Sequence, residues 1–441
     1  QDTWDSDIPV WQSRTGHPLW GDPRPQEPDL LALDSLHDCR TPTLPWNSLR
    51  ALCARIIKGW IGDYPEWDLE PRHGPGAVSE GRVVKFDFPN WPTKLEGVFP
   101  YDWYGSGSLE NENVPSHVES PSRLIAVPKS QKGPRLICAE PVSHQWIQQA
   151  IFRWLEFRIR RCPVGRSVDF RRQDLSRDRA LSSSHDNSLC TIDLSSASDR
   201  ISTRLVEYAF QGTNLLDAFH ASRTRVLSQT ISDDHPKMVV LRKFSTMGSA
   251  LTFPVQSLVF FLLTLWALRL SEGNEEHFDG LEDDIGRITV FGDDIIAPNA
   301  AYETIELVLH ECGLKVNKTK TFTGKNFRES CGCYAFRGVD ITPAYALQPY
   351  DGSPTSLATL VEMSNNFFLK GYWNTSSTIV NQLPETERRK LLVSKVGGSS
   401  GLSLVSFSGT NVHLFKKRYD KNLHKEYVKA LGLTHKSDRT K

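Results

Sequence analysis

The chain has 441 residues, 39% of them hydrophobic and 24% charged, and its formal net charge at pH 7 is zero. These values are typical of a soluble protein long enough for about two to three domains or subdomains. The neutral balance excludes attraction of nucleic acid by overall charge, so such a partner would have to be held by local basic patches. Eight cysteines without a Cys-x-x-Cys pair favour reduced thiols in a cytosolic compartment over a zinc site.

Two features bear on targeting. The first residues are polar and include Asp2, Asp5 and Asp7, so we expect no secretory signal. The most apolar segment, residues 258–268, is too short to span a bilayer. We interpret it as a buried core helix and expect no membrane partner.

The first 120 or so residues are rich in Trp, Pro and Gly. Frequent Pro and Gly break this region into short elements, with one helix predicted over residues 48–60. Residues 123–141 then contain two apolar runs, 124–127 and 136–139. Because a turn separates these runs, they predict a β-hairpin.

The tip of that hairpin carries three cations: Lys129, Lys132 and Arg135. Lysine acts on phosphate as a point charge and arginine as a bidentate fork, so the three side chains are suited to a triphosphate. A solvated basic turn is an equally good interpretation of the residues alone.

Arginines outnumber acidic residues between positions 153 and 179. The segment begins as an amphipathic helix, residues 151–159, and is expected to continue as a polar connection. Arginine clusters can track a phosphate backbone. A solvated helix face is the commoner explanation of a charge run, and the residues leave both interpretations open.

Residues 189–194 are expected to form a short buried strand with Asp193 near its end, where an apolar run has no structural use for a carboxylate. Ser195 and Ser198 then offer caps for a helix that runs through residues 205–210. Asp199 could be a first-turn acid favoured by the helix dipole. Asp193 is the stronger functional candidate.

Residues 245–248, Ser-Thr-Met-Gly, are expected to form a small, flexible loop that opens the long apolar helix, with Pro254 tolerated only in the first helical turn. An acidic run follows and ends with Asp283 and Asp284. Glycines rather than β-branched residues flank this pair. We therefore interpret the run as a solvated loop and not as a metal site.

Residues 288–298 carry a second acidic pair, Asp293 and Asp294, preceded by Gly292 and flanked by Val, Phe and Ile. A Gly-Asp centre between β-prone runs predicts a tight hairpin. Adjacent carboxylates repel each other and raise each other's pKa, so a fold that displays them at a turn usually supplies a cation. The hairpin therefore suggests a divalent metal site.

A helix is expected over residues 302–312, followed by a short strand over 315–322 that bears Lys318 and Lys320. Taken in order, the predicted elements describe a nucleic-acid polymerase palm. Its chemistry needs two metal ions about 4 Å apart. Carboxylates from two strands, Asp193 and the pair at 293–294, would hold them, and a cationic side chain could protonate the leaving group.

At this point the chain resembles the levivirus-type RNA-directed RNA polymerases, the replicase β subunits of positive-strand RNA bacteriophages. The string Phe-Arg-Glu-Ser-Cys-Gly is the most family-specific of the matching motifs. The motifs lie between about residues 120 and 345, at 191–202, 245–248 with Thr252, 290–296, 318–322, 327–332 and 338–343.

The resemblance implies an α/β (α+β) right-hand polymerase fold. Its expected parts are an N-terminal region with fingers over residues 1–188, a palm of antiparallel sheet packed on helices over 189–345, and a thumb with the C-terminal region over 346–441. It also implies RNA-directed RNA synthesis with primer-independent initiation on a single-stranded template, in the cytoplasm of the bacterial host.

Site roles follow from the resemblance residue by residue. Asp193, Asp293 and Asp294 would hold two Mg²⁺ ions, with Mn²⁺ as a possible substitute, and Lys320 would be the general acid, with Lys318 as its alternative. The expected nucleotide-binding residues are Lys129, Lys132, Arg135, Asp199, Ser245, Gly248 and Thr252. Asp199, with Ser245 or Thr252, would sense the ribose 2′-hydroxyl.

The implied partners are a single-stranded RNA template, nucleoside triphosphates and, as in the familiar replicases, host translation elongation factors Tu and Ts and a ribosomal protein. Two positions depart from the common pattern. Gln256 stands where many RNA polymerases have Asn, which puts the partner of Asp199 in question. Phe291 replaces a common Tyr, and its ring should still pack beneath the Gly-Asp-Asp turn.

Three other functions fit part of the sequence. A mitovirus or narnavirus-like RNA polymerase would share the palm, but the Phe-Arg-Glu-Ser-Cys-Gly string favours a phage enzyme. A reverse transcriptase fits poorly, because Asp199 occupies the position associated with ribose selection. A non-catalytic RNA-binding protein with a palm fold is disfavoured, because little but metal binding would favour gathering three carboxylates.

Overall fold

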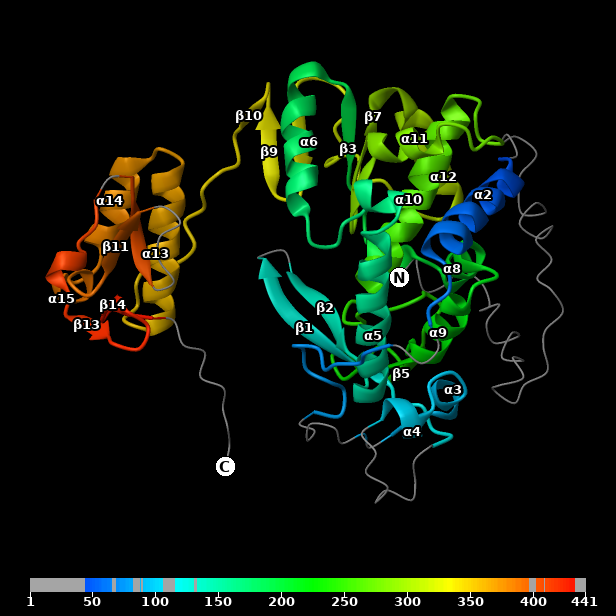
Figure 1. Cartoon of the computed structure of the whole chain (residues 1–441), viewed down its shortest axis with the longest axis horizontal. Coiled ribbons are helices and arrows are strands. Elements are labelled where there is room, and N and C mark those ends of the chain that lie inside the picture. The colour runs from blue at the N-terminus through cyan, green and yellow to red at the C-terminus, as the bar shows by residue number, and fades with distance from the viewer. Residues whose placement is uncertain are drawn as a thin grey trace. The chain divides into compact units, whose positions relative to one another are not determined.

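The structure is a computed structural model that describes residues 44–65, 69–81, 88, 90–105, 116–130, 133–395, 402–407 and 409–432. The chain divides into two compact units, Gln1–Ile341 and Thr342–Lys441. Each unit contains helices and strands (Figure 1), so the predicted mixed α/β class is confirmed. The units are described separately below.

Helix α10, Thr252–Ser271, is the core of the first unit (Figure 1). Leu, Phe, Val and Trp occur all round the helix, which is the pattern of a helix buried on every side. It is long and apolar enough to cross a membrane, but 89% of its most hydrophobic window is buried inside the protein. The prediction of a core helix is confirmed.

Helix α2, Trp46–Cys53, continues directly into a π-helical segment η2, Ala54–Ile61. The helix predicted over residues 48–60 is therefore present, with its second half more loosely wound. It packs on α10, where the Trp46 and Trp266 rings lie 5.4 Å apart. The Trp266 indole N–H also donates to Ser48 Oγ at 2.8 Å.

The other helices of the first unit surround this core. They are α3 Thr93–Glu96, α4 Tyr101–Tyr104, α5 Val142–Ile159, η3 Pro163–Arg166, α6 Gln173–Asp186, α7 Ala197–Arg200, α8 Thr203–Phe210, α9 Asn214–Ser222, α11 Leu281–Arg287, η4 Asn299–Ala301 and α12 Tyr302–Glu311. Helix α8 is capped by Ser202, whose Oγ accepts the Leu205 N–H. The cap expected at Ser195 or Ser198 is therefore wrong, because the short helix α7 intervenes.

Three strands form the antiparallel sheet that packs against α10. They are β3 Leu189–Ile192, β6 Thr289–Phe291 and β7 Asp294–Pro298, in the order β3-β7-β6. Ile192 pairs with Ile295, and Phe291 pairs with Asp294. This register places the end of β3 beside the turn between β6 and β7.

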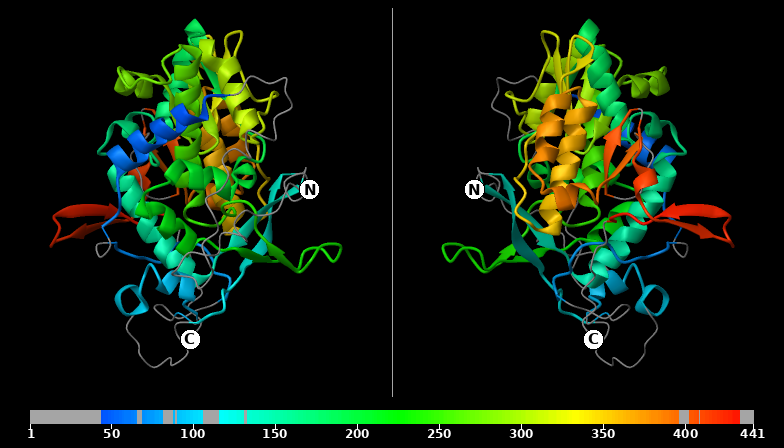
Figure 2. Two further views of the ribbon diagram at one scale, coloured as in Figure 1. Left: turned by 90° about the vertical axis from the view of Figure 1, so that its right-hand side faces the viewer. Right: turned by 90° about the vertical axis from the view of Figure 1, so that its left-hand side faces the viewer.

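A second sheet has the order β2-β1-β4-β5. Its strands are β1 Ser122–Ser130, β2 Gly133–Ala139, β4 Val226–Ser228 and β5 Met238–Val240. Strands β1 and β2 are antiparallel, with Val127 opposite Arg135, which confirms the hairpin predicted in this region. Figure 2 shows the two strand pairs, cyan and green, extending toward the same side.

A third, smaller sheet has the order β10-β9-β8, formed by β8 Phe327–Ser330, β9 Cys333–Phe336 and β10 Val339–Asp340. Helix α6 packs on β8 and β9 where a polar connection was expected. The prediction failed because the buried face of α6 consists of small residues, among them Ser176, Ala180 and Ser183. Such a face gives no apolar periodicity.

The second unit has its own core around Leu360 and Val361 of helix α13. Its elements are α13 Pro354–Leu369, α14 Trp373–Asn381, α15 Glu385–Arg388, β11 Leu392–Lys395, β12 Ser403–Ser406, η5 Val412–Leu414, β13 Lys417–Asp420 and β14 Lys425–Val428. Ser353 caps α13 by accepting the Ser356 N–H, with Pro354 as the first helical residue, a position that proline tolerates.

Candidate active site

The Gly-Asp-Asp segment forms the tight turn between β6 and β7, as predicted. Gly292 has φ 65°, a conformation that residues with a side chain rarely adopt. A Cβ atom at Gly292 would lie 3.1 Å from the Phe253 ring and 3.3 Å from Gln256 Nε2. The Gly292 N–H donates to Ser257 Oγ at 3.0 Å. The first two turns of α10 therefore support the turn directly.

Phe291 packs beneath this turn, as expected from its sequence position. Its ring meets Phe253 of α10 edge to face, with centroids 4.9 Å apart. Phe253 in turn contacts Phe170 at 5.6 Å. The aromatic stack supports the acidic turn without a tyrosine hydroxyl.

Asp193 follows β3 directly, and the register of β3 with β7 brings it beside Asp294. The Asn317 side-chain amide donates to Asp193 Oδ2 at 2.8 Å, and the Asn317 backbone N–H donates to the Asp193 carbonyl at the same distance. Asn317 therefore fixes both the backbone and the carboxylate of Asp193. Nothing in the sequence had pointed to Asn317.

The three carboxylates influence one another electrostatically. Burial raises the pKa of Asp294 from 3.8 to about 6, and Asp293 and Asp193 add to the rise, while hydrogen bonds from Cys331 oppose it. Among the described residues, no group of three or more His, Cys, Asp or Glu side chains is arranged to hold a metal ion as it stands. The carboxylates are neighbours without forming a finished ligand set.

The donor set fits a hard divalent cation. Carboxylate oxygens are the ligands that Mg²⁺ prefers. Burial is the main cause of the raised pKa of Asp294, and the charges of Asp293 and Asp193 add to it, so ionising this carboxyl in the folded protein has a free-energy cost. A cation would remove that cost, because an opposite charge favours the ionised form of a carboxylate.

The loop of residues 245–252 is closed by its own hydroxyls. Ser245 Oγ lies 2.8 Å from Thr252 Oγ1, and Thr252 Oγ1 donates to the Thr246 carbonyl at 2.6 Å. Both Ser245 and Thr252 are buried. These two predicted nucleotide-binding residues therefore contact each other in this structure.

Gly248 holds the same loop against the free edge of β2. A Cβ atom at Gly248 would lie 1.7 Å from the Cys138 carbonyl oxygen, far inside a van der Waals contact. The Met247 carbonyl accepts the Cys138 N–H at 2.7 Å. Gly248 is thus needed for close approach of two backbones, and the structure assigns it this packing role.

Asp199 pairs with Lys243, whose ammonium group contacts Asp199 Oδ1. Gln256, which stands at the position of the expected asparagine, lies beneath Gly292 instead. Its Oε1 is buried and has no hydrogen-bond partner within the described part of the chain. The partner of Asp199 is therefore a lysine that sequence reasoning missed, since an isolated basic residue carries no distinctive signal.

The cations of the β1–β2 hairpin are only partly described. Arg135 is exposed on β2. Lys132 and the side chain of Lys129 lie outside the described residues. The hairpin is confirmed, and the role of its tip stays a prediction.

The strand predicted over residues 315–322 is wrong. Val316 and Phe322 form single bridges to Leu194 and Thr191, and the residues between them turn. Asn317 causes the turn, because its amide binds Asp193 while its Oδ1 accepts the Thr319 hydroxyl at 2.8 Å. Side-chain bonds of this kind compete with strand pairing.

The two candidate lysines differ in their surroundings. Lys318 pairs with Glu306 of α12 at 2.9 Å and lines a cavity of about 770 Å³ with Arg200 and Lys315. Lys320 is exposed, and its charge acts to lower the pKa of Glu329, which burial raises overall. Lys318 is therefore already paired, whereas Lys320 lies near enough to Glu329 of β8 to act on its pKa.

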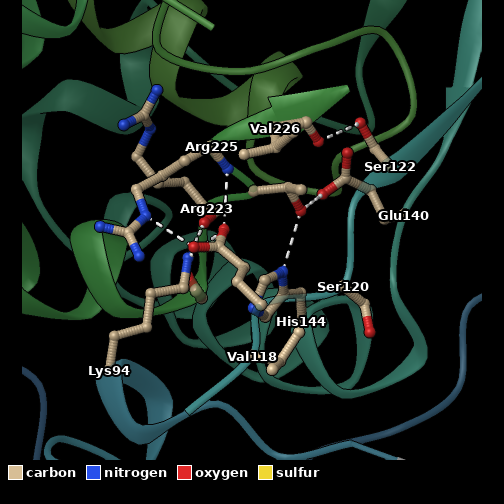
Figure 3. Close-up of polar contacts among 12 residues, drawn as sticks. Lys94, Val118, Ser120, Ser122, Glu140, His144, Arg223, Arg225 and Val226 are labelled. Carbon is tan, nitrogen blue, oxygen red and sulfur yellow. Dashed lines mark hydrogen bonds and ion pairs between the residues drawn. The ribbon is translucent and has the colours of Figure 1, made fainter. Parts of the chain in front are cut away.

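A buried ionic network includes Lys94, Arg223, Arg225 and Glu140 (Figure 3). Glu119 accepts from Lys94 Nζ at 2.8 Å and from Arg225 Nε at 2.6 Å. These two cations hold the pKa of Glu119 far below its usual range against the effect of burial. Burial lowers the pKa of Lys94 to about 8, and Glu119 opposes part of that shift.

The network reaches the loop through Arg223 and Glu140. Arg223 Nε donates to the Phe244 carbonyl at 2.8 Å, and its Nη2 donates to the Lys243 carbonyl at 2.9 Å. Glu140 accepts from the Thr246 hydroxyl at 3.0 Å and from the Thr224 hydroxyl at 2.7 Å. The buried Arg223 and Glu140 side chains therefore hold the backbone of residues 243–246, which includes Lys243.

The arginines of residues 153–179 are largely paired with acidic neighbours. The ion pairs are Arg153–Glu70, Arg160–Asp169, Arg166–Glu282, Arg171–Glu156 and Arg172–Asp174. A paired, solvated surface accounts for this segment. Of the two interpretations left open by the sequence, the structural one is favoured.

The chain was compared with known proteins. The family model described as RNA replicase, beta-chain, matches residues 106–385. The RNA-directed RNA polymerase beta chain of Enterobacteria phage fr is 36% identical over 226 residues, which are 51% of this chain and 38% of the relative. That of Escherichia phage MS2 is 34% identical over 252 residues, 56% of this chain and 42% of the relative.

The RNA-directed RNA polymerase subunit beta of Escherichia virus Qbeta is 31% identical over 259 residues, 57% of this chain and 40% of the relative. The chain thus matches less than half the length of these three relatives. A solved RNA-dependent RNA polymerase of a human picorbirnavirus has a TM-score of 0.43 at 12% identity, covering 79% of this chain and 71% of the other; this likeness is too low to decide the fold. On the family match, the chain belongs to the RNA replicase β-chain family.

Proposed function

We propose that this protein is an RNA-directed RNA polymerase that replicates the genome of a positive-strand RNA phage by two-metal nucleotidyl transfer. The observation that carries the proposal is the register of β3 with β7, which brings Asp193 beside Asp294 and the adjacent Asp293. The family match and the names of the relatives agree with it. The first unit would contain fingers and palm, and the second the thumb.

Asp193 and Asp293 are the principal metal ligands in this proposal, with Asp294 as a third carboxylate. The ions are two Mg²⁺, for which Mn²⁺ can substitute. When bound there, they would lower the pKa of the 3′-hydroxyl of the growing RNA strand and neutralise the triphosphate. Asn317 orients the Asp193 carboxylate through its 2.8 Å hydrogen bond.

Selection of ribonucleotides is assigned to Asp199, with Lys243 holding its carboxylate. The 2′-hydroxyl is the group by which a protein distinguishes RNA from DNA precursors. Ser245 and Thr252 support this position from the adjacent loop. The cations Lys129, Lys132 and Arg135 grip the triphosphate.

Lys320 protonates the leaving pyrophosphate. The Lys318 and Lys320 side chains are both exposed. Lys320 is preferred because Lys318 is paired with Glu306 at 2.9 Å, whereas Lys320 forms no ion pair with any described residue. A general acid must reach the proton acceptor within hydrogen-bond distance, and an exposed lysine on a turn has the freedom to do so.

The template is single-stranded RNA, copied without a primer in the cytoplasm of a bacterial host. Elongation factors Tu and Ts and a ribosomal protein are proposed as partners by analogy with the family. The chain matches less than half the length of its relatives. For this reason the activity assay below also tests whether such partners are required.

The test is incorporation of labelled ribonucleotides on a short RNA ending in cytidines, with Mg²⁺, by wild type and Asp293→Asn. Loss of one metal-binding carboxylate should cost several kcal/mol of transition-state stabilisation, or about a thousand-fold in rate. Asp283→Asn, in the other acidic pair, is the matched control and should keep full activity. Deoxynucleotides should be rejected.

A silent wild type is next assayed with bacterial extract. Rescue by the extract, abolished again by Asp293→Asn, supports the polymerase with missing host partners. Equal activity of wild type and Asp293→Asn contradicts the proposal. Silence under both conditions, with RNA binding retained, would favour a non-catalytic RNA-binding protein.

A further inference from the structure

The Phe-Arg-Glu-Ser-Cys-Gly segment contains a strained turn. Cys331 and Gly332 connect β8 to β9, with φ 47° and 74°, and Ser330 pairs with Cys333 across the turn. Positive φ at both central residues is typical of a turn that prefers Asn or Gly. A cysteine at the first of these positions is an outlier that a fold keeps only under some constraint.

The constraint is visible in the contacts of this turn. Cys331 Sγ donates to Asp294 Oδ2 at 3.4 Å, and Ser330 Oγ donates to Asp294 Oδ1 at 3.3 Å. Each oxygen of the Asp294 carboxylate therefore accepts a bond from one of two successive residues.

The turn is itself fastened to the strand that leads to Asp193. Arg328 Nε donates to the Leu189 carbonyl at 2.6 Å, and the Glu329 N–H donates to Thr191 Oγ1 at 3.4 Å. Arg328 is fully buried. These hydrogen bonds attach β8 to β3. Because Ser330 and Cys331 at the end of β8 bind Asp294, the position of Asp294 is linked to that of Asp193.

We propose that Ser330 and Cys331 are positioning residues that hold the Asp294 carboxylate for binding of a divalent cation, and that Cys331 keeps its strained backbone for this purpose. The inference rests on the proposed metal site. Asp294 lies beside two like charges, which would drive an unanchored carboxylate away from them. Hydrogen bonds to a metal-binding carboxylate fix its orientation, and their loss typically weakens metal affinity about 10- to 100-fold.

Cys331→Gly separates this role from a merely structural one. Glycine accepts φ 47° without strain, so the variant should unfold at the same or a higher temperature, while the thiol donor is lost. We expect the Kd for Mn²⁺, measured by electron paramagnetic resonance on the full chain, to rise about 10-fold. The Mg²⁺ concentration for half-maximal incorporation should rise in parallel.

Two variants complete the test. Cys331→Ser retains a donor and should restore most of the Mn²⁺ affinity. Cys162→Ala removes another half-buried thiol, bonded to the Ile159 carbonyl at 3.4 Å, and should leave the affinity unchanged. Unaltered Mn²⁺ binding by Cys331→Gly overturns the inference, as does an equal loss in Cys162→Ala.

Failure of the proposed function gives a different result. If Asp293→Asn binds Mn²⁺ as tightly as the wild type, the proposed metal site is absent and both proposals fall together. If Asp293→Asn loses binding while Cys331→Gly keeps it, the metal site stands and only the positioning role is lost.

Discussion

Two Asp-Asp pairs lie close together in the first unit, and their surroundings are opposite. Asp283 and Asp284 belong to helix α11, where Asp284 is paired with Arg269 and with Arg287. Asp294 meets a hydroxyl, a thiol and two further carboxylates. Arginines of the protein itself neutralise Asp284, whereas Asp294 has other carboxylates rather than cations beside it.

Helix α10 contacts both pairs. Its first turns support Gly292 through Phe253 and Ser257, and its last turn supplies the buried Arg269 to Asp284. The sequence interpretation of residues 272–284 as a solvated loop is confirmed for residues 273–280, which are largely exposed and not helical. It was wrong for residues 281–284, which belong to α11, because the distant Arg269 side chain pairs with the half-buried Asp284. The comparison shows that the role of an Asp-Asp pair depends on whether the fold places a cationic side chain beside it, and not on the dipeptide itself.

Removal of the Asp284 charge should have the largest effect on stability. Asp284→Asn leaves the Arg269 guanidinium, 2% exposed, without its carboxylate. Breaking a buried ion pair by removing one partner costs about 3–5 kcal/mol. The free energy of unfolding from urea titration should fall by that amount, and a change below about 1 kcal/mol would show that the pair is as weak as a surface one.

Asp294→Asn should have the opposite sign in metal-free buffer. The raised pKa, from 3.8 to about 6, means that the folded protein favours the protonated carboxyl; this stabilisation is present below pH 3.8 and is lost as pH rises through 6. At pH 7 the neutral amide should therefore raise the free energy of unfolding by about 3 kcal/mol. The gain should vanish at pH 4, and a pH-independent difference would contradict the assignment.

Asp283→Asn should change least. Asp283 is exposed on α11, and surface substitutions of this kind usually stay within about 0.5 kcal/mol. The variant therefore calibrates the other two in the same urea titrations. A large loss of stability here would mean that the α11 acids act as a unit, and the contrast between the two pairs would weaken.

Local patterns explain what the sequence could predict. The Gly-Asp-Asp hairpin, the β1–β2 hairpin, strand β3 and helix α10 each have a periodicity or turn residue within a short window. The register of β3 with β7 then brings Asp193 to Asp294, which the order of motifs had suggested. The sequence was therefore sufficient to predict that the candidate metal ligands lie close together.

The rest depends on contacts between distant positions. Lys243 reaches Asp199 across 44 positions, and Asn317 reaches Asp193 across 124. Neither residue stands out in its own surroundings. The buried network of Glu119 and Glu140 escaped for the same reason, because a carboxylate in a polar stretch gives no sign that its partners lie elsewhere in the fold.

The contact at Gly248 gives the amide hydrogen of Cys138 an unusual position. This hydrogen belongs to a β-strand, yet its acceptor is the Met247 carbonyl of a distant loop. An amide exchanges with deuterated solvent only when its hydrogen bond opens. The exchange rate of the Cys138 amide therefore reports the opening of the hydrogen bond between the loop and the strand. One backbone position of β2 can thus be used to follow movement of the loop.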